Sequence, residues 1–311
     1  MTLDYQMVER FADSLRSRGK QPATIESYCR DAQRFLDYLG RYDLPPNAVE
    51  PSTLMGYQDF LRSDLEERDN SVRRTVIGIR QFFRFLSESR AISSTPFDSV
   101  PIPMRDEALG KGLSAEQIAK LIHIAQSGRP ACKAARDGAI VSLLAYEGVK
   151  ANELINLRWV DLITEGNTSS LHIGGSRARS IRLSDATLSL MLAYRSQYLN
   201  IRHHAIVQAT DKRIFVSFKG RDASSPLPVM TRHGLKFILY ELGDKLPLAK
   251  LNTEQLRHYA VSYLIGLGRA PDEIMAHLGL RRLGNIAKHL AQGKRLTRDD
   301  SLPAQSALTP L

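Results

Sequence analysis

The feature that most constrains the fold of this chain is a segment rich in proline and glycine, about one third of the way along. Pro96, Pro101 and Pro103 stand close together, and Gly110 and Gly112 follow. Proline removes a backbone donor and glycine favours turns, so a long helix or strand is not expected to cross this segment. We therefore expect two domains, 1–103 and 114–290, joined by a linker at 104–113 and followed by a C-terminal tail, 291–311.

Apolar residues recur at helical spacing on both sides of this linker. The first hundred residues carry four such stripes, the clearest running from Ile25 to Leu39, and we place the starts of the third and fourth helices at Ser52 and Ser71. Ser114, with Gln117 three residues later, predicts the first helix of the second domain.

Further helical patterns follow in the second domain, interrupted by one short hairpin. Residues 171–173 and 180–183 alternate in the manner of strands around Gly174 and Gly175. The sequence thus predicts a mainly α-helical protein with a small β-sheet.

Charge is distributed unevenly along the chain. The net charge is +10 and the isoelectric point is near 9.7, values that suggest a polyanionic partner. Residues 1–103 carry 14 Lys and Arg against 15 Asp and Glu, whereas residues 104–311 carry 29 against 18. Most of the non-specific attraction for phosphate is therefore expected from the second part. A basic but otherwise ordinary protein remains the alternative from charge alone.

One group of arginines in the first domain shares a helix face. Arg73, Arg80 and Arg84 are spaced by seven and four residues, which places them on the polar side of the fourth predicted helix. They could follow the phosphates of a DNA backbone, or they could form a solvated charged surface.

Several other classes of protein are disfavoured. Cys29 and Cys132 are far apart and form no metal-binding pattern, so we expect no metal and no cofactor. No apolar run approaches the roughly 20 residues that cross a bilayer, and the first ten residues lack the pattern of a secretory signal. We expect a cytoplasmic, nucleoid-associated protein.

Five segments, in order and spacing, resemble the tyrosine recombinase (phage integrase, XerC/XerD-like) family, and the resemblance spans about residues 5–290. They are Pro22–Tyr28 with Phe35-Leu36, then Ile79–Leu86, then Tyr146–Leu154 followed by Leu157-Arg158-Trp159 and Asp161, then Leu256–Ala260, and finally His277–Leu280. The resemblance implies an N-terminal four-helix core-binding (SAM-like) domain and a C-terminal α+β domain of the recombinase type.

The resemblance also implies a particular chemistry. In such a site a tyrosine hydroxyl attacks a DNA phosphate and forms a phosphotyrosyl link. Two arginines hold the non-bridging oxygens, because a planar guanidinium matches phosphate bidentately. A lysine on the hairpin protonates the leaving oxygen, and histidines assist proton transfer.

Carried over residue by residue, the family site is largely replaced in this chain. Of six catalytic positions only Arg257 keeps the expected type. The others hold Lys150 for the first arginine, Gly174 for the hairpin lysine, Glu254 and Leu280 for the two histidines, and His289 for the tyrosine.

These replacements remove specific functions. A lysine carries charge but not the two-pronged geometry of arginine, and glycine offers no acid. A carboxylate at Glu254 repels a phosphate, and no tyrosine occurs between Tyr263 and the last residue given, Leu311. We therefore expect no DNA strand cleavage.

The leading hypothesis is a catalytically inactive protein that clamps double-stranded DNA. It would act as an accessory subunit or a regulator in site-specific recombination or integration of a mobile element, assembling with itself or with an active recombinase through its C-terminal segment. The expected DNA contacts are Lys150, Arg177, Arg179, Arg257, His258, Arg281 and Arg282 in the second domain and Arg73, Arg80 and Arg84 in the first.

Two alternatives stay open. His289 could serve as a non-standard nucleophile in an active recombinase, since an imidazole can form a phosphoramidate. A helical scaffold with no nucleic-acid role is a further alternative, disfavoured by the charge imbalance and by the retained Arg257.

Overall fold

The computed structural model divides into two compact units, Met1–Leu109 and Gly110–Leu311, called unit 1 and unit 2 below. The residues described are 2–104, 112–128, 130–165, 168–201, 213–218, 229–248, 250–284 and 286–287. Most of the predicted linker, the position of His289 and the predicted tail at 291–311 lie outside the described residues.

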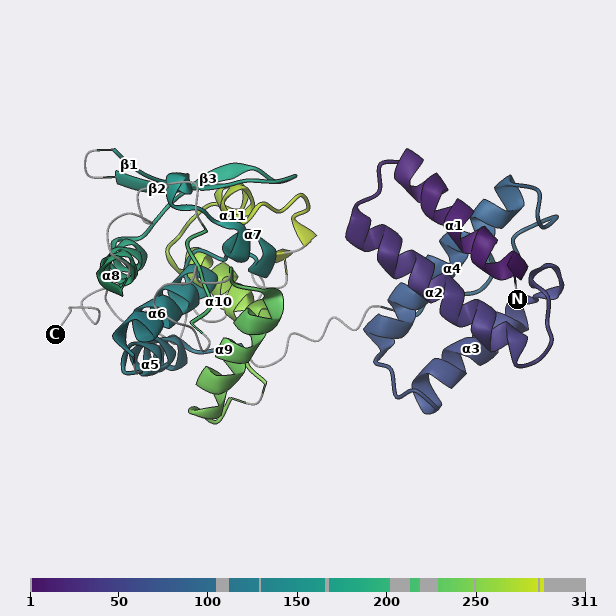
Figure 1. Ribbon diagram of the computed structural model, residues 1–311, viewed down its shortest axis with the longest axis horizontal. Coiled ribbons are helices and arrows are strands. Elements are labelled where there is room, and N and C mark those ends of the chain that lie inside the picture. Colours follow the sequence, from purple (N-terminus) through teal and green to yellow (C-terminus); the bar gives the residue numbers. More distant parts are fainter. Residues whose placement is uncertain are drawn as a thin grey trace. The chain divides into compact units, whose positions relative to one another are not determined.

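Unit 1 is a bundle of helices around an apolar core (Figure 1). Phe35, Tyr57, Phe83 and Phe97 meet edge to face in this core, with ring centroids 4.5–6.0 Å apart. The helices are α1 (Thr2–Ser17), α2 (Pro22–Gly40), α3 (Pro51–Ser63) and α4 (Asp69–Glu88), with a 3-10 turn at Pro46–Ala48.

A buried carboxylate joins α2 to α4. Asp31 is fully buried, and one of its oxygens accepts a hydrogen bond of 2.5 Å from Arg74. A Cβ at Gly78 would stand only 3.0 Å from Oδ2 of Asp31, the same oxygen that accepts this hydrogen bond. The absence of a side chain at Gly78 therefore lets the two helices cross closely. Burial raises the pKa of Asp31 above its usual value, and the Arg74 charge acts in the opposite direction.

Unit 2 packs its helices around a second core and carries a small sheet on one side, with α11 next to β3 (Figure 1). The helices are α5 (Ala115–Gln126), α6 (Ala131–Ala145), α7 (Ala151–Asn156), α8 (Asp185–Ile201), α9 (Arg232–Asp244), α10 (Thr253–Gly266) and α11 (Pro271–Leu278). A 3-10 turn at Trp159–Asp161 precedes the sheet.

The sheet is antiparallel, in the order β1 (Leu162–Glu165), β2 (Thr168–Ile173) and β3 (Arg179–Arg182). Leu171 of β2 pairs with Leu162 on one side and Ile181 on the other. The sequence predicted only the hairpin of β2 and β3. It missed β1 because this strand is largely exposed and lacks the alternation that marks a half-buried strand.

The mainly helical fold with a small sheet is confirmed, and the helix starts are partly correct. Ser114 caps α5 as predicted, since its hydroxyl accepts from the backbone N–H of Gln117. The predicted starts at Ser52 and Ser71 are wrong by one and two residues. The third helix begins at Pro51, directly after Glu50, and the fourth begins at Asp69. Proline at the first helical position and an acidic residue in the first turn mark helix starts as serine does, and the local pattern does not separate these signals. Among the described residues no helix has the length and apolar character needed to cross a bilayer.

Candidate nucleic-acid interface

Arg257 is the centre of the predicted site, and α10 holds it in a buried position. Only 9% of the residue is exposed, and its guanidinium donates to the carbonyl oxygens of Gly148 (2.5 Å) and Leu278 (2.8 Å). Burial lowers the pKa of Arg257, while the carboxylates of Glu153 and Glu254 oppose that effect. The side chain therefore ties the segment before α7 to the end of α11.

Arginines cap three consecutive carbonyls at the C-terminus of α11, where helix carbonyls lack partners within the helix. The pairs are Arg179 Nε to His277 O (2.7 Å), Arg257 Nη2 to Leu278 O (2.8 Å) and Arg177 Nη1 to Gly279 O (3.0 Å). Gly279 itself adopts a left-handed conformation (φ 61°), and a Cβ there would stand 2.8 Å from Arg179 Nη1. We call this group the arginine-capped end of α11.

Glu153 supplies the opposite charge of the site. Its carboxylate accepts two hydrogen bonds from Arg179, at 2.9 and 3.0 Å, and both side chains are about nine-tenths buried. Burial alone raises the pKa of Glu153, but the Arg179 hydrogen bonds and the backbone N–H of Lys150 outweigh it, so the pKa lies below the usual value. This ion pair joins β3 to α7.

Lys150 stands at the entrance to α7, beside these groups. Its ammonium lies 3.6 Å from the Glu153 carboxylate and its side chain is 38% exposed. Burial lowers the pKa of Lys150; Glu153 acts against this, and Arg257 and Arg179 lower the pKa further. The motif does therefore bring Lys150 and Arg257 together, and the ammonium retains access to solvent.

A second buried carboxylate, that of Glu147, contacts α11 through His277. Glu147 accepts from the backbone N–H (3.1 Å) and the hydroxyl (2.9 Å) of Ser184, and its other oxygen is 3.5 Å from His277 Nε2. That last contact has the distance of an ion pair but not the geometry of a hydrogen bond. Burial raises the pKa of Glu147, yet His277 and Ser184 together bring it below the usual value.

Three further described positions are those that the resemblance matches to the hairpin lysine and the two histidines. Gly174 lies in the open hairpin turn, and no described atom comes within 4 Å of a Cβ placed there. Glu254 is exposed in the first turn of α10, and Leu280 packs against the small apolar cluster around α11. His258 is exposed on α10.

The tyrosines nearest to the site pack against one another. The rings of Tyr146, Tyr259 and Tyr263 have centroids 4.9–6.1 Å apart. Burial raises the pKa of Tyr146 to about 12 and raises those of Tyr259 and Tyr263 as well. These phenols are neutral at physiological pH and serve as packing groups.

The remaining residues predicted to contact DNA differ in their exposure and in their hydrogen-bond partners. Arg281 and Arg282 are exposed beyond α11, and Arg84 is exposed on α4. Arg73 donates to the carbonyl of Pro103 at 2.6 Å. On the same face, Arg80 is half-buried, and its Nε and Nη2 are themselves buried without a hydrogen-bond partner among the described residues. These two nitrogens form one edge of the guanidinium, the edge that grips an oxyanion bidentately.

Sequence reasoning missed several basic residues that surround α7. Arg232, at the start of α9, donates to the side chain of Asn152, and Arg213 donates to the carbonyl of Asn156. Arg158 is exposed at the other end of α7. Arg213 and Arg232 lie 57 and 80 residues from their partners in sequence, and no local pattern could have found them.

The class of this protein follows from two separately packed helical units, the second with a small sheet and a cluster of basic side chains around Arg257. The sequence model of the Phage integrase family matches residues 111–290, and that of the Phage integrase N-terminal SAM-like domain matches residues 8–89. These matches cover most of the chain. The protein therefore belongs to the phage integrase family of tyrosine recombinases, and the predicted resemblance is confirmed at this level.

Relatives extend over most of the chain at low identity. The tyrosine recombinase XerD of Listeria monocytogenes serotype 4b (strain F2365) is 26% identical over 278 residues, which cover 84% of this chain and 86% of the relative. The tyrosine recombinase XerC of Roseiflexus sp. (strain RS-1) is 23% identical over 264 residues, covering 83% and 80%.

Solved structures share the fold. The XerH site-specific recombinase bound to its palindromic difH substrate, in a post-cleavage complex, superposes with a TM-score of 0.69 at 15% identity, covering 93% of this chain and 83% of the other. A lambda integrase(75-356) dimer bound to a COC' core site gives 0.66 at 12% identity, covering 97% and 99%.

Proposed function

We propose that this protein binds double-stranded DNA in the manner of its family but does not cut it. The observation that carries the proposal is the set of side chains around Arg257 and at the hairpin turn. The basic groups that could hold a phosphate are present, whereas the hairpin turn offers Gly174 in place of an acid. The neighbouring tyrosines are packed and have raised pKa values, which makes them poor nucleophiles.

Within this proposal the cations divide into two groups. Lys150, Arg281, Arg282 and His258 in unit 2, with Arg80 and Arg84 in unit 1, would contact DNA phosphates directly. Arg281, Arg282, His258 and Arg84 are exposed, the Lys150 side chain is 38% exposed, and Arg80 is half-buried with two guanidinium nitrogens that have no acceptor among the described residues. Arg177 and Arg179 would mainly hold the site together, since their guanidinium groups are already engaged by carbonyls and by Glu153. The Arg257 guanidinium is engaged by two carbonyls in the same way, and its phosphate contact stays a prediction.

The biological role follows from binding without cleavage. The protein would act as an accessory subunit or regulator in recombination or integration of a mobile element, alongside an active recombinase. The DNA complexes among its structural relatives, a XerH recombinase on its substrate and a lambda integrase dimer on a core site, support the DNA-binding part of this proposal.

A suicide DNA substrate tests the proposal. We expect binding that weakens steeply with salt, because phosphate contacts release counterions. We expect no covalent protein–DNA adduct on a denaturing gel. An adduct that disappears in the His289→Ala variant would establish the alternative of an active enzyme with a histidine nucleophile. Absence of any salt-dependent binding would refute DNA binding itself.

A further inference from the structure

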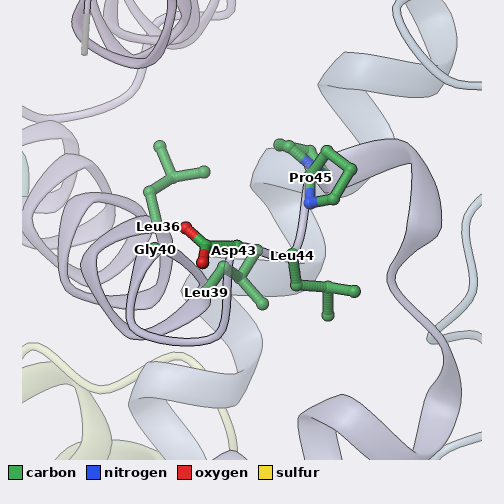
Figure 2. Close-up of a pocket in the computed structure, with 7 residues that line it drawn as sticks. Leu36, Leu39, Gly40, Asp43, Leu44 and Pro45 are labelled. Carbon is green, nitrogen blue, oxygen red and sulfur yellow. The ribbon is translucent and has the colours of Figure 1, made fainter.

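Two carboxylates of this protein are held in opposite ways. Asp43 of unit 1 is exposed and lines a hollow of about 230 Å³ beside Leu36, Leu39 and Leu44, where water can solvate it (Figure 2). Glu147 of unit 2 is enclosed, with only 4% of its side chain exposed. A buried carboxylate depends on its protein neighbours for the stabilisation that water gives at the surface. The role of Glu147 therefore follows from the groups that face it.

Arg269, in the loop between α10 and α11, completes a chain of three side chains. Its Nη1 lies 3.5 Å from His277 Nδ1, and His277 Nε2 lies 3.5 Å from an oxygen of Glu147. Arginine only donates, so Nδ1 is the accepting nitrogen and the ring hydrogen belongs on Nε2, on the side of the carboxylate. The imidazole thus lies between a cation and an anion and presents to each the nitrogen that suits it.

The contact between His277 and Glu147 lies next to the backbone that holds Arg257. Each of the two residues directly precedes a carbonyl that accepts from the Arg257 guanidinium, Gly148 after Glu147 and Leu278 after His277. A Cβ at Gly148 (φ 60°) would collide with the Leu278 side chain, so the turn before α7 lies directly against the end of α11. The side chains of Glu147 and His277 therefore join the same two segments that Arg257 joins.

Lys150 ends this turn, three residues after Glu147, and its backbone N–H donates to Glu153 at 2.9 Å. The Lys150 side chain is partly exposed, and its ammonium lies 3.6 Å from the Glu153 carboxylate. Burial lowers the pKa of this amine against the attraction of Glu153, and the charges of Arg257 and Arg179 add to the lowering. The pKa of Lys150 therefore reports where the turn holds the ammonium.

We propose that Arg269, His277 and Glu147 are positioning residues: their contacts hold the turn before α7 against α11 and so place the Lys150 ammonium to receive a DNA phosphate. The backbone N–H and hydroxyl of Ser184 fix one oxygen of Glu147, at 3.1 and 2.9 Å, which leaves the second oxygen for His277. The phosphate step rests on the proposed function, whereas the placement of Lys150 stands without DNA. A positioning role requires a nitrogen at the place of His277 Nε2, whereas a packing role would be served by an apolar group.

The pH dependence of Lys150 acetylation in the full-length, DNA-free protein tests the placement. Competitive labelling with trace acetic anhydride across a pH series, read by mass spectrometry, gives the pKa of this amine. Glu147→Gln with His277→Leu removes the contact without stranding a buried charge. The pKa of Lys150 should then rise toward its ordinary value, since the loosened amine is less buried and farther from Arg257. His277→Gln keeps a nitrogen donor toward Glu147 and should preserve the wild-type profile.

Two further variants provide a milder break and a control. Arg269→Met breaks the chain at its more exposed end and should shift the Lys150 profile in the same direction, so it decides the case if the double variant does not fold, which thermal unfolding checks. Tyr194→Phe removes a buried hydrogen bond to the carbonyl of Ile214 (3.0 Å), elsewhere in unit 2, and should leave the profile unchanged. A wild-type profile in either folded variant that breaks the chain, or an equal shift in His277→Gln or Tyr194→Phe, overturns the proposal.

DNA affinity tests the phosphate step separately. On a short duplex, the variant with Glu147→Gln and His277→Leu should bind about fivefold more weakly than the wild type, since one phosphate contact is misplaced. Beside Lys150→Met the same pair of changes should have no further effect, because both act through one ammonium. Additive losses would overturn the phosphate step. If Lys150→Met alone leaves the affinity at the wild-type level, the Lys150 contact of the proposed function fails, and the acetylation profile still decides the placement.

Discussion

Arg80 and Arg84 of unit 1 are held differently from the arginines at the end of α11 in unit 2. In unit 2, Arg177, Arg179 and Arg257 donate to backbone carbonyls at the arginine-capped end of α11, and Arg179 also pairs with Glu153. In unit 1, the Nε and Nη2 of Arg80 have no acceptor among the described residues, and Arg84 is exposed.

The difference teaches that net charge overstates the capacity of unit 2 for phosphate. Residues 104–311 have eleven more basic than acidic residues, but several of those cations stabilise the fold. Unit 1 is almost neutral and yet holds a buried guanidinium edge that no group of the described residues satisfies. The contacts that an arginine already makes within the protein, and not the number of arginines, decide whether it can bind a phosphate.

The largest expected effect concerns the ion pair of Arg179. Arg179→Met leaves the buried Glu153 carboxylate uncompensated and should lower the free energy of unfolding by about 3 kcal/mol, measured by chemical denaturation. Arg182→Met, at an exposed position on the same strand, should change it by less than about 0.5 kcal/mol. Similar losses in both variants would mean that the arginines of β3 are interchangeable.

The partner carboxylate gives a related but smaller effect. Glu153→Gln weakens charged hydrogen bonds and should cost about 2 kcal/mol at pH 7. Because the pKa of Glu153 is lowered in the folded state, its stabilisation is complete above the unfolded value of about 4.3 and is lost as the pH falls through the folded value.

Unfolding curves from pH 7 to pH 3 therefore check the sign of this effect. The wild-type protein should lose more stability on acidification than the Glu153→Gln variant does. The exposed Glu165→Gln serves as the control and should follow the wild type. A steeper acid loss in Glu153→Gln would contradict the assignment.

Arg80 should behave in the opposite way to Arg179. Arg80→Met removes a guanidinium edge that has no protein acceptor, so the free energy of unfolding should stay the same or rise. The slope of log affinity for DNA against log salt should fall by about 1, the value of a single phosphate contact. Arg10→Met, on the exposed face of α1, should leave that slope unchanged. If Arg80→Met destabilises the protein and spares DNA binding, the contrast between the units fails.

The smallest expected effect comes from restoring the hairpin lysine. Gly174→Lys meets no described atom within 4 Å of its Cβ and should change stability by less than about 0.5 kcal/mol. It should not produce a covalent adduct with a suicide substrate, since the tyrosine nucleophile is not restored with it. An adduct would show that the missing acid alone keeps the protein inactive.

The sequence predicted the helices and the small sheet well, because apolar periodicity and the Ser114 capping box are local signals. It also predicted that Lys150 and Arg257 lie near each other in the fold, because both belong to motifs of one family site. It did not predict that Arg177 and Arg179 cap carbonyls about a hundred residues away. A guanidinium suits a carbonyl, a carboxylate or a phosphate, and only the fold determines which of these it meets.

The arginine-capped end of α11 has a consequence for movement. Its three carbonyls are held by side chains from β3, from the hairpin turn and from α10, so sliding or rotating α11 would strain its contacts with three separate segments. The chain that continues past Leu280 therefore departs from a fixed anchor, and any reorientation of that continuation is expected to hinge after α11 and to leave the helix in place.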